Sequence, residues 1–172
     1  MTTASSDKNE ILAATAETVS QLVKLMSSVD DKNINTIPYE GSWTAPQLLR
    51  HVTKSIDGMA TAIRANAKSA ERDPGERIEE LKKVFLDLSK KLKSPEFIVP
   101  EEGNYEKQPA INDLDRSFIQ FKDNANKANL DDLVEGLPLG PITKLEIIHF
   151  VLFHTQRHLQ QMKKICDALK EK

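Results

Sequence analysis

The chain has 172 residues, of which 39% are hydrophobic, 29% are charged and 5% are aromatic. This length and balance predict one globular domain over residues 1–172, which is large enough to build a core without disulfides. The single cysteine excludes an internal disulfide. A net charge of −2 excludes a general nucleic-acid-binding surface, and no apolar run is long enough to cross a membrane. The polar segment up to Glu10 carries no export signal, so we expect a cytoplasmic protein.

Apolar residues that recur every three to four positions predict five helical segments, at about residues 6–28, 44–68, 73–94, 112–128 and 143–169. Three of these segments begin with a capping-box pattern, at Thr44, Asp73 and Thr143, each followed three residues later by Gln or Glu. The composition also favours helices, because aromatic residues are few. We therefore predict an all-α protein, a four-helix bundle of four main helices with one short additional helix.

A long middle loop is expected over residues 94–109, which contain three prolines and Gly103. The segment is too long for a turn between bundle helices, and loops of this length are often functional. The run Phe97, Ile98, Val99 within it is the best candidate for a strand. We expect the loop to fold over one end of the bundle near His51 and to limit access there; a surface connection without a role is the alternative.

Two of the four histidines, His154 and His158, are four residues apart in the last helical segment and therefore lie on one face of it. At about 100° per residue both fall within the apolar arc of that helix, whereas His149 falls outside it and is excluded as a ligand. His51, at the edge of the apolar stripe of the second helix, is expected to reach a solvent-accessible seam between helices. Three imidazoles could hold zinc or a neighbouring transition metal with one position open. The alternative is ordinary histidines on a half-buried helix face.

Other candidate residues carry weaker signals. Thr155 stands where the His-Glu-x-x-His pattern of zinc proteases has its general-base Glu, which disfavours that class. Gln161 could hydrogen-bond a ligand or a bound water, or be an ordinary amide at the helix edge. Cys166 lies on the apolar face and is expected to be a core thiol. Trp43 is expected to pack at the start of the second helix.

Three stretches of the chain together resemble the DinB-like superfamily of metal-binding four-helix bundles. They are residues 42–51 (SWTAPQLLRH), 139–143 (LGPIT) and 154–161 (HTQRHLQQ). The order of elements also matches: one histidine on the second helix, a long middle connection, and the paired histidines on the last helix.

The resemblance implies that His51, His154 and His158 hold a divalent metal ion, zinc or nickel, and that Gln161 matches a position that often follows the paired histidines. We take Gln161 as the candidate catalytic or substrate-orienting residue. The family includes thiol-dependent transferases, so we expect a thiol-S-transferase or a hydrolase. Its substrate would be a small molecule, such as a low-molecular-weight thiol, without nucleic-acid or membrane partners; a homodimer is left open. The alternative is a non-enzymatic bundle that acts in stress response or binds small ligands.

Overall fold

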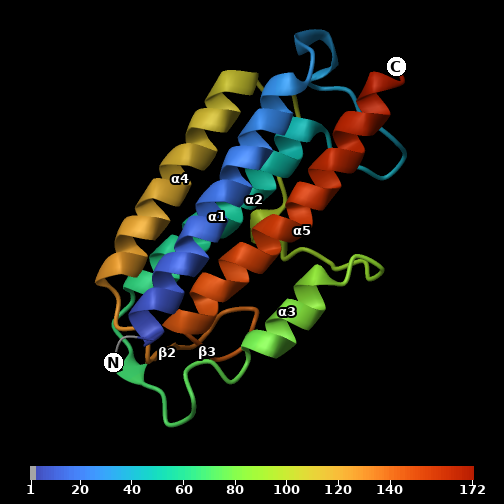
Figure 1. Cartoon of the computed structure of the whole chain (residues 1–172). Coiled ribbons are helices and arrows are strands. Elements are labelled where there is room, and N and C mark those ends of the chain that lie inside the picture. Colours follow the sequence, from blue (N-terminus) through green and yellow to red (C-terminus); the bar gives the residue numbers. More distant parts are fainter. Residues whose placement is uncertain (1–2) are drawn as a thin grey trace.

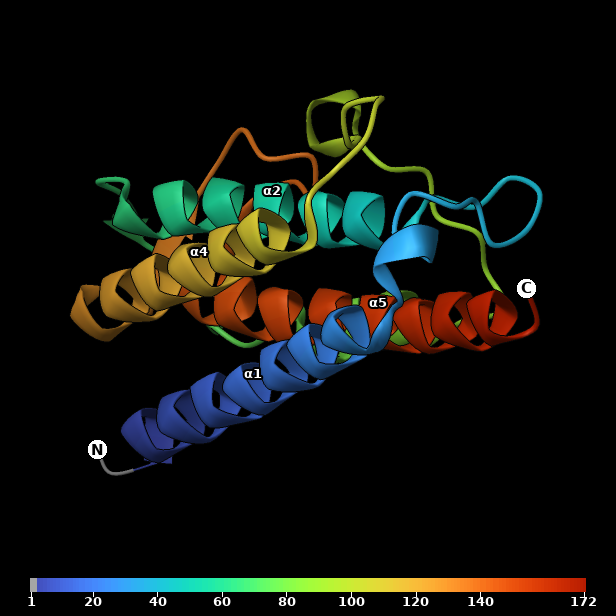
Figure 2. The ribbon, with the colours of Figure 1, turned by 90° about the horizontal axis from the view of Figure 1, so that it is seen from above.

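Four long helices form a bundle: α1 (Thr3–Ser28), α2 (Ala45–Arg64), α4 (Lys107–Lys127) and α5 (Lys144–Lys170), as Figure 1 shows. This computed structural model describes residues 3–172, so the start of the polar segment expected up to Glu10 lies outside the described residues. Seen from above, α2 and α4 form one layer and α1 and α5 the other (Figure 2). The shorter α3 (Ile78–Leu86) packs against α5. The prediction of an all-α four-helix bundle with one short extra helix is confirmed.

The long middle loop follows from the direction of the helices. In Figure 1, α1 and α5 run one way, whereas α2 and α4 run the other way and lie side by side. Parallel neighbours need a connection that returns along the full length of the bundle, about 30 Å for a helix of 20 residues. The helix α3 covers part of this return, and residues 87–106 cover the rest.

Two of the three predicted capping boxes, at Thr44 and Thr143, are present in the structure. Thr44 and Thr143 each cap their helix, and side-chain oxygens of Gln47 and Glu146 accept a hydrogen bond from the backbone N–H of the cap residue. The prediction of a third box at Asp73 was wrong: Asp73 accepts instead from the backbone N–H of Gly75 in a turn, and α3 begins only at Ile78 and ends at Leu86. Helix α4 begins earlier than predicted, because Pro109 lies in its first turn, where no backbone N–H is needed.

A small antiparallel sheet closes one end of the bundle. Strand β1 (Lys68–Ser69) pairs with β2 (Asp132–Val134), which pairs with β3 (Ile142–Thr143). These strands were not predicted, because two or three residues are too few for an alternating pattern. The predicted strand at Phe97 was wrong, since Glu96–Ile98 forms a single 3₁₀ turn, η2.

The first turn of α5 is fixed by Glu146, whose side chain is completely buried. Its carboxylate accepts two hydrogen bonds from the Arg72 guanidinium, at 2.7 Å each, and one from the backbone N–H of Arg77. Burial alone raises the pKa of the Glu146 carboxyl, but the hydrogen bonds from Arg72 and from the Thr143 and Arg77 backbones outweigh it and lower the pKa. One carboxylate therefore joins the segment before α3 to the start of α5.

In the described part of the chain, no helix is long and apolar enough to span a membrane.

Replacing Glu146 with Ala removes the capping partner and leaves Arg72 and two backbone N–H groups without their acceptor. We expect the free energy of unfolding, measured with urea, to fall by about 2–4 kcal/mol. The matched control is Glu80→Ala, because the Glu80 side chain is 58% exposed and pairs with Arg77 at the surface; this change should cost under about 1 kcal/mol. Equal losses in both variants would contradict the structural role of Glu146.

Candidate metal centre

Three histidines that lie far apart in the sequence meet between α2 and α5. The Nε2 atom of His51 lies 3.3 Å from that of His154 and 3.0 Å from that of His158, and the latter two are 3.1 Å apart. All three side chains are buried. In the described residues they form the one group of histidine, cysteine or carboxylate side chains with the spacing to hold a metal ion.

The burial of His51 corrects the expectation of a solvent-accessible seam. Its side chain is only 1% exposed, although its position on the helix is at the edge of the apolar stripe. The 3₁₀ turn η2 packs over it, and its Nδ1 atom lies 2.9 Å from the carbonyl oxygen of Ile98. The covering therefore comes from the long loop, which a helical wheel of α2 does not contain.

Outer hydrogen bonds fix which ring nitrogen carries the proton in His51 and in His158. A carbonyl oxygen only accepts, so His51 donates from Nδ1–H to Ile98. In the same way His158 donates from Nδ1–H to Oε1 of Gln161, at 2.9 Å. The Nε2 atoms of both neutral rings then carry lone pairs, and these face each other. Two such lone pairs repel unless a proton or a cation lies between them.

The donor set fits a metal ion. Three imidazole nitrogens that bind one tetrahedral zinc ion at about 2.0–2.1 Å lie about 3.4 Å from one another. The separations of 3.0–3.3 Å between the Nε2 atoms are close to this value. The outer hydrogen bonds of His51 and His158 are those that orient metal-binding histidines in proteins generally.

The surroundings also keep the imidazoles in the neutral form that binds metals. Burial lowers the pKa of His51, and burial together with the neighbouring rings lowers the pKa of His154 well below its ordinary value. Burial, with a contribution from His51, lowers the pKa of His158 to about 3. The cluster is therefore uncharged at neutral pH.

The remaining residues singled out from the sequence lie outside this cluster of nitrogens. His149 is buried, with its Nδ1 atom 3.0 Å from the carbonyl oxygen of Leu145 and its ring near Phe153. The Thr155 hydroxyl donates to the carbonyl of Val151. Cys166 is a core thiol as predicted, and burial raises its pKa.

A cavity of about 1010 Å³ lies against the three histidines. Ser94, Pro95 and residues 97–99 of the long loop form part of its wall, so the loop does fold over His51 as expected. The later part of the loop does not reach the cavity. There Glu101 pairs with Arg50 and Lys54, and the Tyr105 backbone binds the Asn35 side chain.

Some residues at the site were not found from the sequence. Trp43 packs on His51 with ring centroids 4.8 Å apart, although it was expected only to pack at the start of the helix. The ring of Phe85 lies against that of His154, with the ring centroids 6.0 Å apart. Arg157 donates to the backbone carbonyls of Phe85, Asp87 and Lys90 and so holds the start of the loop. An aromatic residue two positions before α2 could have indicated the contact between Trp43 and His51. The contacts of Arg157 could not be predicted, because backbone carbonyls leave no trace in the sequence.

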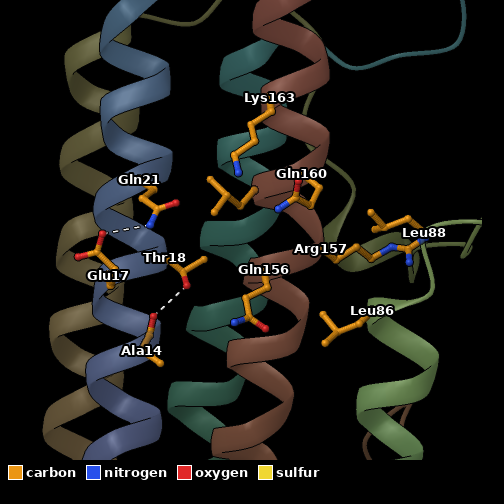
Figure 3. Close-up of a pocket in the computed structure, with 11 residues that line it drawn as sticks. Ala14, Glu17, Thr18, Gln21, Leu86, Leu88, Gln156, Arg157, Gln160 and Lys163 are labelled. Atoms are coloured by element: carbon orange, nitrogen blue, oxygen red, sulfur yellow. Dashed lines mark hydrogen bonds between the residues drawn. The ribbon is translucent and has the colours of Figure 1, made fainter.

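A second cavity, of about 490 Å³, lies between α1 and α5 and is shown in Figure 3. Its walls include Glu17, Thr18 and Gln21 of α1 and Gln156 and Lys163 of α5, and none of its lining residues is a histidine. Leu88, Arg157 and Gln160 border both cavities. The larger cavity is therefore the one that gives access to the histidine cluster.

Comparison with known proteins gives a family and a fold. The model of the DinB superfamily matches residues 14–162. The crystal structure of TT2238, described as a four-helix bundle protein, is similar with a TM-score of 0.59 and 16% sequence identity; the alignment covers 91% of this chain and 98% of that one. At this identity the likeness concerns the fold. A comparison with curated proteins finds no match.

The lowered pKa values predict how the metal-free protein responds to acid. Between pH 6.5 and 5 the unfolded chain takes up protons on histidines, whose ordinary pKa is about 6.5, while the buried cluster stays neutral. The unfolded state then binds more protons, so the free energy of unfolding should fall as pH falls, by up to about 1.4 kcal/mol per pH unit for each histidine that stays neutral. Carboxyl groups contribute little in this window.

The control for this titration is the variant His51→Gln, His154→Gln, His158→Gln, measured with urea at the same pH values. His149 is common to both proteins, so only the cluster differs. The variant should lose most of the pH dependence between pH 6.5 and 5. Equal slopes in the two proteins would mean that the cluster is not held neutral.

Proposed function

The chain belongs to the DinB superfamily, and we propose that it is a metal-dependent enzyme formed by a single domain over residues 1–172. His51, His154 and His158 would hold one divalent ion, zinc or nickel, and a small molecule would reach it through the larger cavity. Both metals bind imidazole nitrogen well, so the ligand type is compatible with either.

One observation carries this proposal. Three Nε2 atoms converge within 3.3 Å at the wall of a cavity of about 1010 Å³. Structural zinc sites use four protein ligands, whereas catalytic sites use three and leave a position for substrate. Among the described residues no fourth ligand completes the group. This arrangement supports a catalytic site.

The protein's own groups have separable roles in this proposal. Ile98 and Gln161 accept the Nδ1–H protons of His51 and His158 and thereby aim both Nε2 lone pairs at the ion. We assign Gln161 as a positioning residue. Trp43 and Phe85 lie against the rings of His51 and His154, with ring centroids 4.8 and 6.0 Å apart, and form an aromatic wall beside the cluster. When bound, the ion would supply a Lewis acid that lowers the pKa of a thiol or a water molecule.

The charge around the cluster favours a thiol over water as the nucleophile. Glu40 is the one carboxylate among the residues that line the cavity, and it comes from the loop before α2 rather than from either ligand-bearing helix. No carboxylate on α5 faces the histidines in the way that a metalloprotease base does, since Thr155 binds the backbone. A thiol, with an ordinary pKa of about 8.5, ionises more readily without such a base. We therefore place transfer of a low-molecular-weight thiol before hydrolysis.

The lack of a general base on α5 beside the histidines also fits a second function. A site without a general base can bind a small ligand through its metal ion and perform no chemistry. A non-enzymatic ligand-binding bundle is therefore the competing proposal, and turnover distinguishes it from an enzyme.

The test uses protein purified without a nickel column. Wild type should contain about one divalent ion per chain, and His154→Ala should contain almost none because two imidazoles do not retain the ion. His149→Ala is the matched control and should keep the metal. The zinc-loaded wild type should transfer a low-molecular-weight thiol to chlorodinitrobenzene faster than His154→Ala does. Equal metal content in all three proteins would contradict the site, and metal without turnover would favour the binding bundle.

Gln161 gives a further prediction. Gln161→Leu removes the acceptor for the Nδ1–H of His158 and should weaken zinc affinity about 10- to 100-fold. Gln161→Glu keeps an acceptor at the same place and should restore the affinity, as measured by competition with a fluorescent chelator. If Leu and Glu have the same effect, the hydrogen bond does not position His158. Gln160→Leu, on the exposed neighbour, serves as the control.

A further inference from the structure

The large cavity beside the histidines is polarised, and we propose that it binds an amphipathic organic anion. The apolar part of this molecule would lie between α2, α3 and α5, and its acidic group would face the lysines of the loop that follows α3 and of the last turns of α5. The statement that this anion is the substrate of the metal centre rests on the proposed function. The binding itself does not.

Positive charge gathers on one part of the cavity wall. The charged residues that line it are Glu40, Lys90, Lys91, Lys93, Arg157 and Lys164. The whole chain has a net charge of −2, so five cations around one cavity are a local concentration. Arg157 is engaged by backbone carbonyls and Lys90 lies near Asp87. In the described residues Lys91, Lys93 and Lys164 form no ion pair, so their charge is directed to solvent and to the cavity.

The opposite part of the wall contains no charged side chain among its described residues. It is lined by Ser55, Gly58 and Met59 of α2, by Val84 and Phe85 of α3, by Pro138 and Leu139, and by Phe150 of α5. Because α2 and α5 run in opposite directions, the residues after His51 on α2 and those before His154 on α5 share one end (Figure 1). The histidines therefore lie between an apolar end and Lys164. From Phe150 to Lys164 the α5 wall extends about 21 Å.

Gly58 supports the assignment of the apolar end. It lies inside α2, where glycine destabilises a helix relative to alanine. Its backbone does not have a positive φ, and a Cβ atom added there would meet nothing within 4 Å. Neither backbone conformation nor crowding requires glycine at this position. What the missing side chain provides is space in the cavity.

Exposed apolar side chains also line the cavity. Of the eight large hydrophobic side chains that are exposed in the described part of the chain, five line this cavity: Tyr39, Leu88, Leu92, Phe97 and Val99. Phe97 is 64% exposed. A patch of this kind beside cations could also touch a membrane surface. We favour a small molecule because the apolar wall continues inward to buried histidines, which a flat membrane surface does not reach.

The test compares two probes with the same ring system, anilinonaphthalene sulfonate and its uncharged analogue phenylnaphthylamine. Binding is followed by quenching of Trp43, which is the one tryptophan of the chain and lines the cavity. Wild type should bind the sulfonate about tenfold more tightly. The variant Lys91→Gln, Lys93→Gln, Lys164→Gln should lose about fivefold or more of the sulfonate affinity and keep that for the neutral probe.

Matched controls separate a local from a general charge effect. The variant Lys82→Gln, Lys83→Gln, Lys122→Gln changes the net charge equally at exposed positions outside both cavities and should bind the sulfonate as wild type does. Gly58→Leu should weaken both probes severalfold, whereas Gly58→Ala should have a small effect. Each variant should keep the zinc content of wild type.

Three results would overturn the proposal: equal affinity for the two probes, equal losses in the two lysine variants, or binding to phosphatidylglycerol vesicles in the absence of probe binding. The failure of the proposed function is seen separately. If wild type binds no metal but still prefers the sulfonate, the metal centre is wrong and the anion pocket stands. If His154→Ala loses the metal and the wild type shows no preference, the metal centre stands and the anion pocket is wrong.

Discussion

The Nε2 atoms of three buried imidazoles lie 3.0–3.3 Å from one another, and those of His51 and His158 present lone pairs to each other. This contact is unfavourable in a neutral cluster, and burial prevents the rings from relieving it by taking up protons from solvent. The hydrogen bonds to Ile98 and Gln161 keep the lone pairs in place. A cation shared by the three nitrogens turns the same geometry from a cost into a stabilising interaction. The long loop, the larger cavity and the aromatic rings of Trp43 and Phe85 all contact these histidines.

The bundle produces the contact through its connections as much as through its helices. Parallel packing of α2 and α4 requires a long return segment, and that segment supplies both the carbonyl that orients His51 and part of the cavity wall. Arg157, one residue before His158, donates hydrogen bonds to the backbone carbonyls of Phe85 and Asp87 and so fixes the start of the same segment. Glu146 fixes the beginning of α5 two turns before His154. The site thus lies on two rigid helices, and its surroundings are supplied by the loop that the topology demands.

The sequence was sufficient for the features that depend on local spacing. The capping residues Thr44 and Thr143 give the starts of α2 and α5, and the four-residue spacing of His154 and His158 puts both rings on one face. It was insufficient where distant segments decide the outcome. The burial of His51 depends on a turn 47 residues later in the chain, and the strands are formed by pairing alone. Asp73 has the residue type of a cap, but its side chain binds a nearer backbone N–H, and no pattern distinguishes the two uses.

X-ray absorption spectroscopy of the zinc-loaded protein, before and after addition of a low-molecular-weight thiol, examines the three-histidine centre most directly. The proposed centre predicts three imidazole nitrogens at about 2.0–2.1 Å and one further light atom, which a sulfur atom at about 2.3 Å should replace when the thiol is added. The spectrum of His154→Ala should lack this shell. Four protein ligands that do not change with thiol, or a spectrum that is the same in wild type and His154→Ala, would contradict an open metal centre held by His51, His154 and His158.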